Sequence, residues 1–113
     1  MELTVEHIGD VTAVGVNVEQ LDASNADDFR QQMAPVLVGC RKLVLDLGRV
    51  QFADSRGCGA ILSCLKQVAA AGGDLKLCRV TKPVRTVFEL IRLHRLCEIV
   101  GTREEAVQAF AAQ

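Results

Sequence analysis

An aspartate and a serine lie side by side where a helix is predicted to begin. Asp54 and Ser55 follow an apolar strand-like segment at residues 43–47 and precede a run of apolar residues at helical spacing. A helix start needs a side-chain oxygen for its free N–H groups, and it favours anions such as phosphate. Gly57 and Gly59 leave the first turn without side chains at two positions. We therefore predict an accessible hydroxyl at a helix start, open to the approach of another protein.

Enzyme chemistry is poorly supported around this hydroxyl. Ser55 lacks the G-x-S-x-G elbow of hydrolases, and the glycines are not followed by the Lys-Ser/Thr of a nucleotide-binding loop. His7 and His94 are far apart in the sequence, so neither is predicted to act as a base for a serine or a cysteine. A small thiol or hydrolytic enzyme is accordingly the weakest interpretation, and we predict no catalytic residues and no cofactor.

The five cysteines are scattered, odd in number and without a Cys-x-x-Cys pair, so no zinc pattern or disulfide framework emerges. We predict reduced thiols, all five reactive once the protein is denatured, and a cytoplasmic location. Cys58 lies on the apolar face of its predicted helix and is expected in the core. Cys64 falls off that face and is the better candidate for an exposed thiol.

The composition predicts one domain over residues 1–113. Half of the residues are hydrophobic and the few aromatic ones are all phenylalanine, so the core must be aliphatic. A net charge of −1 argues against nucleic-acid binding through phosphate attraction. No apolar run is long enough to enter and cross a bilayer, and residues 1–6 are acidic and alternating, unlike a signal peptide.

Strand and helix patterns alternate along the chain. Alternating residues predict a hairpin at its start, with Gly9 and Asp10 as the turn. The predicted order is β-β-α-β-α-β-α-β-α, an α/β fold with a mixed sheet whose helices pack mainly on one side. We expect the segment at 43–47 near the centre of the sheet. The predicted strands cover residues 3–7, 14–18, 43–47, 74–78 and 97–100, and the apolar faces of the helices cover 26–37, 58–68, 84–91 and 106–110.

Several residues mark the predicted helix ends. Ser24 or Asn25 can cap the first helix, and Pro35 should kink or end it. Thr102 and Glu105 have the spacing of a capping box at the start of the last helix, where Phe110 is expected to cover part of the core.

These residues resemble a known family. Asp54-Ser55-x-Gly57-x-Gly59, after an apolar strand, is similar to the D-S-[ST]-G-x-G signature of the STAS family, whose best-known members are bacterial anti-sigma factor antagonists. The resemblance covers nearly the whole chain, including residues 21–29, 70–75 and 83–88. Arg56 stands where the family usually has a second small hydroxyl residue. Glu19 and Gln20 precede Leu21, so the family's usual glycine is not in its place there.

The resemblance implies a partner switch. Matching the motif residue by residue makes Ser55 the phosphorylated residue. The unmodified protein is then expected to bind a GHKL-type serine kinase that is also an anti-sigma factor. Phosphorylation would release the kinase, and a PP2C-type phosphatase would reset the switch. The residues expected to bind the partner are Asp22, Ser24, Asp54, Arg56, Gly57 and Gly59.

Other interpretations of the same residues stay open at this point. Ser55 can be only a helix cap, and Asp54 can serve as the cap or orient the serine. Asp22 can be a solvated loop residue, and Arg56 can pair with Asp54 rather than with a partner. At the level of the whole chain, the alternative is a STAS-like subunit that docks in a lipid-transport or transporter assembly without being phosphorylated.

Overall fold

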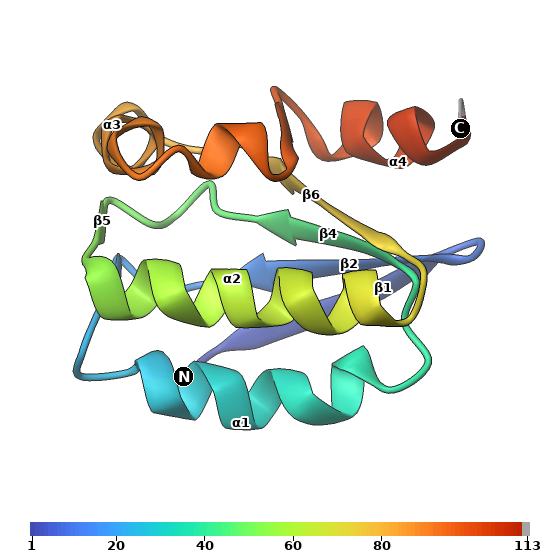
Figure 1. Cartoon of the computed structure of the whole chain (residues 1–113), viewed down its shortest axis with the longest axis horizontal. Coiled ribbons are helices and arrows are strands. Elements are labelled where there is room, and N and C mark those ends of the chain that lie inside the picture. The colour runs from blue at the N-terminus through green and yellow to red at the C-terminus, as the bar shows by residue number, and fades with distance from the viewer. Residues whose placement is uncertain (112–113) are drawn as a thin grey trace.

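The computed structural model describes residues 1–111 as an α/β fold with a five-stranded mixed sheet (Figure 1). The strand order is β1-β2-β4-β6-β7; the first pair is antiparallel and the other pairs are parallel. β3 and β5 pair with each other in a separate two-stranded sheet. The elements are β1 (Leu3–Ile8), β2 (Val11–Val16), β3 (Gln20–Leu21), α1 (Ala26–Leu37), β4 (Lys42–Asp46), β5 (Phe52–Ala53), α2 (Ser55–Ala70), β6 (Asp74–Cys78), α3 (Lys82–Leu90), the 3-10 helix η1 (Leu93–Arg95), β7 (Glu98–Val100) and α4 (Arg103–Ala111).

β4 is the central strand, as predicted, and both of its faces are covered. Leu43 and Leu45 join the larger apolar cluster, whereas Val44 between them joins a smaller cluster on the opposite face. Successive side chains of a strand point to opposite faces, so a strand covered on both faces is apolar throughout. The uninterrupted apolar run at this position therefore reflects burial on both sides.

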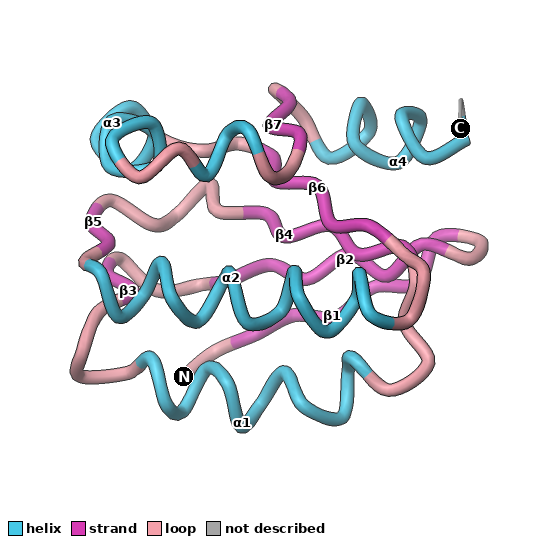
Figure 2. Tube along the Cα trace, viewed as in Figure 1, coloured by secondary structure: helices cyan, strands magenta, loops and turns pink. Residues whose placement is uncertain are grey.

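The helices divide unequally between the two faces. The buried residues of α1, α2 and α3 belong to the larger cluster, and Ala106 and Phe110 of α4 belong to the smaller one. Figure 2 shows α1 and α2 running side by side, with α4 on the far side of the strands. The prediction of helices mainly on one side is confirmed, and Phe110 covers core as expected.

The initial hairpin forms, but its second strand is displaced from the predicted position. β1 and β2 are joined through Gly9 and Asp10, and Ile8 pairs with Val11. The prediction of a strand over residues 14–18 followed the alternating valines. Every residue of β2 is buried, because the strand lies between β1 and β4 under both apolar clusters. The alternating valines therefore did not predict the bounds of β2 correctly, and Val18 lies outside the strand.

The predicted ends of the first and last helices largely hold. α1 ends at Leu37, two residues after Pro35, and Gly39 follows it with a left-handed φ of +71°. At α4, Thr102 Oγ1 accepts a hydrogen bond from the Glu105 N–H at 3.1 Å and donates one to the Glu105 carboxylate at 3.3 Å. Thr102 thus caps the helix as predicted.

All five cysteines are free and buried. Cys58 lies in the core, as predicted. The prediction that Cys64 is exposed is wrong, because α2 packs against α1 as well as against the sheet, which widens its buried arc to include this residue. Burial raises the pKa of the Cys64 thiol to about 11.

Candidate phosphorylation and partner-binding site

Asp54 is the N-cap of α2 and connects the helix to the preceding chain. Its Oδ1 accepts a hydrogen bond from the Gly57 N–H at 2.9 Å, and its Oδ2 accepts one from the Ala23 N–H at 3.0 Å. These bonds, the one from Gly57 foremost, hold the pKa of the Asp54 carboxyl below its ordinary value of 3.8. The carboxylate therefore positions the start of α2 relative to the loop before α1.

Ser55 is the first residue of α2 and is exposed. Since Asp54 supplies the cap, the alternative in which Ser55 is only a helix cap is wrong. Arg56 is also exposed, and within residues 1–111 it forms no ion pair, so the suggested pairing with Asp54 does not occur. The hydroxyl and the neighbouring guanidinium both lie at the surface.

Asp22 and Ser24 lie in the loop before α1, close to Asp54. Asp22 Oδ1 accepts hydrogen bonds from both the N–H and the hydroxyl of Ser24. Asn25 occupies the N-cap position of α1, yet its side chain does not cap the helix: it accepts from the Asp22 N–H at 2.9 Å and donates to the Gln20 carbonyl at 2.8 Å. The local bonds fix the loop and leave Ser24 exposed.

Two short strands join this loop to the start of α2. β3 pairs in parallel with β5, which sets Leu21 opposite Ala53 and brings Asp22 and Asp54 to the same end of the pair. Gly57 is buried against this pair, and a Cβ atom there would overlap the carbonyl of Leu21. Gly59 has more room, because its Cβ position meets only the end of the Arg30 side chain, at 3.5 Å.

The structure therefore brings the predicted residues together and adds one that the sequence did not reveal. Phe52, in β5, exposes 52% of its surface three residues before Ser55. A phenylalanine so exposed beside a polar site is a favourable contact for a partner protein. No periodic pattern predicts its exposure, because β5 has only two residues. Its one clue was a large apolar residue directly after a polar one, Gln51.

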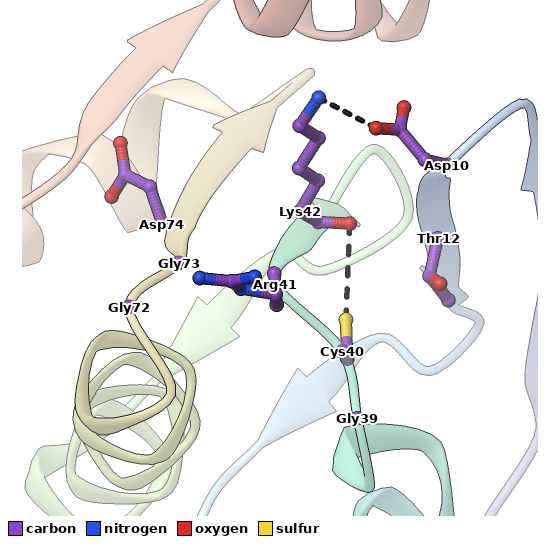
Figure 3. A pocket seen from close by; sticks show the side chains of 9 residues that line it. All are labelled: Asp10, Thr12, Gly39, Cys40, Arg41, Lys42, Gly72, Gly73 and Asp74. Atoms are coloured by element: carbon purple, nitrogen blue, oxygen red, sulfur yellow. Dashed lines mark hydrogen bonds and ion pairs between the residues drawn. The ribbon is translucent and has the colours of Figure 1, made fainter.

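A separate hollow of about 520 Å³ lies at the opposite end of the sheet, where β4 and β6 begin (Figure 3). Lys42 there pairs with Asp10 at 2.7 Å across the opening. α2 begins at Ser55 and ends near this hollow. The 16 residues of the helix are about 24 Å long, and this length separates the hollow from Ser55. The hollow is therefore no part of the Ser55 site.

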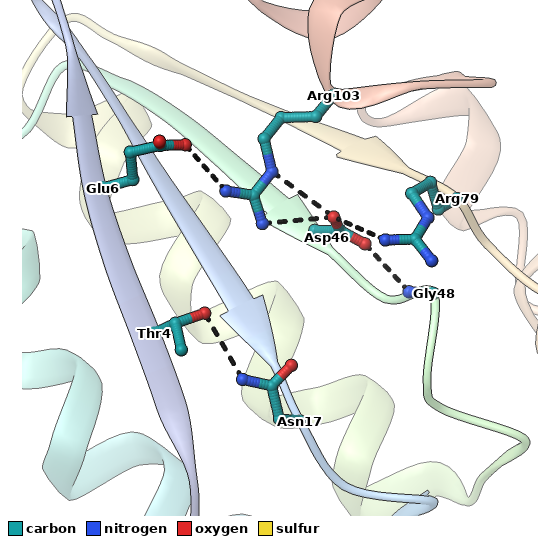
Figure 4. A network of polar contacts seen from close by, with 7 residues as sticks. All are labelled: Thr4, Glu6, Asn17, Asp46, Gly48, Arg79 and Arg103. Carbon is teal, nitrogen blue, oxygen red and sulfur yellow. Dashed lines mark hydrogen bonds and ion pairs between the residues drawn. The ribbon is translucent and has the colours of Figure 1, made fainter.

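A polar network ties α4 to the central strand (Figure 4). Asp46, at the end of β4, is almost fully buried, and its Oδ2 lies 3.1 Å from Arg103 Nη2 and 3.3 Å from Arg79 Nη1. Arg103 also pairs with Glu6 of β1 at 2.9 Å, and Asp46 Oδ1 accepts from the Gly48 N–H. The network holds the last helix against the sheet.

Comparison with known proteins places the chain in one family. Residues 2–106 match the STAS domain, and the chain belongs to that family. It is 32% identical to BtrV of Bordetella bronchiseptica, named as a candidate anti-sigma factor antagonist, over 97% of this chain and 95% of the relative. It is 30% identical to the anti-sigma F factor antagonist of Paenibacillus polymyxa, over 95% and 92%.

Among solved structures, an anti-sigma-factor antagonist (STAS) domain protein from Planctomyces limnophilus superposes with a TM-score of 0.90 at 21% identity, over 96% of this chain and 97% of the other. This likeness concerns the fold. The chain is thus a STAS protein similar to the anti-sigma factor antagonists, a family of regulators rather than enzymes. None of the helices within residues 1–111 is both long and apolar enough to span a bilayer.

Proposed function

We propose that this protein is an anti-sigma factor antagonist that acts by partner switching at Ser55. The observation that carries the proposal is the exposed hydroxyl of Ser55 on a helix start fixed by the Asp54 cap, with Phe52 exposed nearby. The relatives named above support the regulatory class. In the proposed ground state, the unphosphorylated surface binds a GHKL-type kinase that also serves as the anti-sigma factor.

The proposed modification is a phosphoryl transfer from ATP. The bond between the β,γ-bridging oxygen and the γ-phosphorus breaks, a bond from Ser55 Oγ to that phosphorus forms, and ADP leaves. The hydroxyl proton passes to a base of the kinase. In the reset reaction, a PP2C-type phosphatase uses water to return the hydroxyl and release inorganic phosphate.

Charge and size give the phosphate its effect on binding. Phosphorylation adds a charge of about −1.5 to −2 at neutral pH. Asp22 and Asp54 place two carboxylates at this surface, beside the exposed cations of Arg30 and Arg56. A partner packed against the exposed first turn of α2 would meet both the added bulk and the added charge. The domain itself tolerates the group, since a helix N-terminus favours an anion.

The test is incubation with a GHKL-type kinase and ATP, followed by intact mass and site mapping. We expect one phosphate, on Ser55. Ser63→Ala is the matched control, because Ser63 lies on the same helix but about 12 Å from Ser55 and outside the predicted contact residues, and it should be phosphorylated as wild type is; Ser55→Ala should not. Binding of the kinase without any modification of Ser55 would contradict the switch and support a docking function without phosphorylation.

A further inference from the structure

Arg30 of α1 reaches across to the outer surface of α2. Its Nη2 lies 3.5 Å from the position that a Cβ atom would occupy at Gly59, and no other side chain comes within 4 Å of that position. Arg30 is exposed, and within the described residues 1–111 its guanidinium has no carboxylate partner. A cation thus rests on α2 without a counterion there.

This cation lies on the same face of α2 as Ser55. Gly59 follows Ser55 by four residues, so the two positions are neighbours on one face of the helix, with Cβ positions about 5–6 Å apart. Side chains of a helix tilt toward its N-terminus, which directs the Gly59 position toward Ser55. Adding the 3.5 Å separation places the guanidinium within about 9 Å of the Ser55 Cβ atom. A phosphate on Ser55 extends into that gap, and the arginine side chain is long and flexible.

We infer that Arg30 binds the phosphate of phosphorylated Ser55, as an intramolecular clamp between α1 and α2. This inference rests on the proposed function, because it concerns the phosphorylated state of the same site. A guanidinium offers parallel N–H donors that match two phosphate oxygens. Gly59 is suited to the contact because a longer side chain there would occupy the path between the two groups.

The other charges around Ser55 do not replace this contact. The Asp54 carboxylate accepts two backbone N–H groups, and Asp22 accepts from Ser24, so both are engaged with the chain, although their charge opposes the phosphate. Arg56 follows Ser55 directly and therefore points about 100° around the helix from it. The Arg30 guanidinium, by contrast, lies beside Gly59, one turn from Ser55 on the same face of α2.

The clamp gives α1 a part in regulation. It couples the phosphate to a helix that carries none of the motif, and it neutralises part of the charge that a partner meets. The phosphorylated protein is therefore stabilised relative to one without Arg30. The position of this arginine sets how strongly the modified state is held.

The test uses the full chain with phosphoserine installed at position 55 by genetic encoding, without a kinase. The pKa of the phosphate is measured by phosphorus NMR in three proteins: wild type, Arg30→Gln and Lys66→Gln. Lys66 is the matched control, because it is exposed and lies on the same face of α2 but about 16 Å further along the helix. We expect the phosphate pKa in wild type to be about 0.2–0.7 unit lower than in Arg30→Gln, and equal to that in Lys66→Gln.

Added salt should reduce the difference, since the pair is exposed. Equal phosphate pKa values in wild type and Arg30→Gln would overturn the clamp. As a second readout, phosphorylation should raise the melting temperature of wild type more than that of Arg30→Gln; an equal rise in both would also overturn it. Because no kinase takes part, failure of a kinase to modify Ser55 would count against the proposed function alone.

Discussion

A Cβ atom on Gly57 would overlap the backbone carbonyl of Leu21, so that no side chain fits between α2 and β3 at this point. Backbone cannot move aside as a flexible side chain can. We therefore predict that Gly57→Ala destabilises the protein by about 1–3 kcal/mol, by separating β3 and β5 at the site. Gly59→Ala is the matched control: it should be neutral or stabilising by up to about 1 kcal/mol, because alanine favours a helix and only Arg30 is nearby. Urea unfolding of both variants checks this, and equal losses would contradict it.

The capping carboxylate makes a pH-dependent contribution to stability. The folded-state pKa of Asp54 is lowered, chiefly by the N–H of Gly57. The carboxylate therefore stabilises the folded protein fully at a pH above the ordinary pKa of 3.8, and this stabilisation is lost as the pH falls through the folded-state pKa. Asp54→Asn removes the titrating group. We expect the difference in stability between wild type and Asp54→Asn to be largest near neutral pH and to shrink below about pH 4. Thermal melts from pH 3 to 7 test this, and a constant difference would refute it.

The ion pairs of Asp46 should differ in their importance. The side chain of Arg103 is 24% exposed, that of Arg79 54%, and the carboxylate between them is almost buried. Arg103→Gln leaves the buried carboxylate with Arg79 and the Gly48 N–H as its remaining partners, and should cost about 1–3 kcal/mol. Arg79→Gln should cost about 0.2–1 kcal/mol, as exposed pairs do. The two variants are compared by denaturant unfolding; a greater loss in Arg79→Gln would contradict the assignment.

Most of the regular elements of this fold were predictable because they have an apolar pattern over at least five residues or a recognisable cap. Residues 43–47 and 74–78 indicated buried strands, and the structure has β4 and β6 there. The pair of β3 and β5 was not predictable, because two residues carry no period. Neither was η1, which follows the left-handed Arg92 and depends on how α3 ends against the core.

The site was predictable in its motif but not in its surroundings. The sequence indicated Ser55, Asp54 and the two glycines. It could not show which of the first two caps the helix, that Arg30 lies beside them, or that Phe52 is exposed, because these depend on how α1 and β5 pack. The error at Cys64 has the same origin: a helical wheel gives the face of one helix and does not show that a second helix packs beside it.

The buried thiols should be unreactive in the folded protein. Burial raises the pKa of Cys64 from 9.0 to about 11, which reduces its thiolate fraction near pH 8 roughly 100-fold. We expect slow labelling of the native protein by a thiol reagent, and five free thiols in denatured, non-reduced protein prepared anaerobically. Ser55→Cys is the control, because one additional thiol at this exposed position should label rapidly. Rapid labelling of native wild type, or fewer than five thiols on denaturation, would contradict this.

Variants of Ser55 separate the switch from the fold. Because Asp54 is the cap, Ser55→Ala should leave stability nearly unchanged. Under the proposed function it should bind the GHKL-type kinase as wild type does, and ATP should not release it. Ser55→Asp should bind more weakly, since it adds a charge to the contact surface, although one carboxylate copies a phosphate poorly. Calorimetry with the kinase measures all three affinities, and equal affinities together with an unmodified Ser55 would refute the switch.

Arg56 adds a final distinction within the same experiment. It is an exposed cation next to the phosphorylated residue, where the family usually has a small hydroxyl residue. A cation there screens part of the new charge from the partner, so release by phosphorylation should be less complete in wild type than in Arg56→Ser. The quantity to compare is the kinase affinity of the unphosphorylated protein divided by that of the phosphorylated protein. This ratio should be larger for Arg56→Ser than for wild type, and the two ratios should converge as salt is added. An unchanged ratio at low salt would mean that the Arg56 guanidinium lies outside the contact surface, and that phosphate bulk rather than charge drives release.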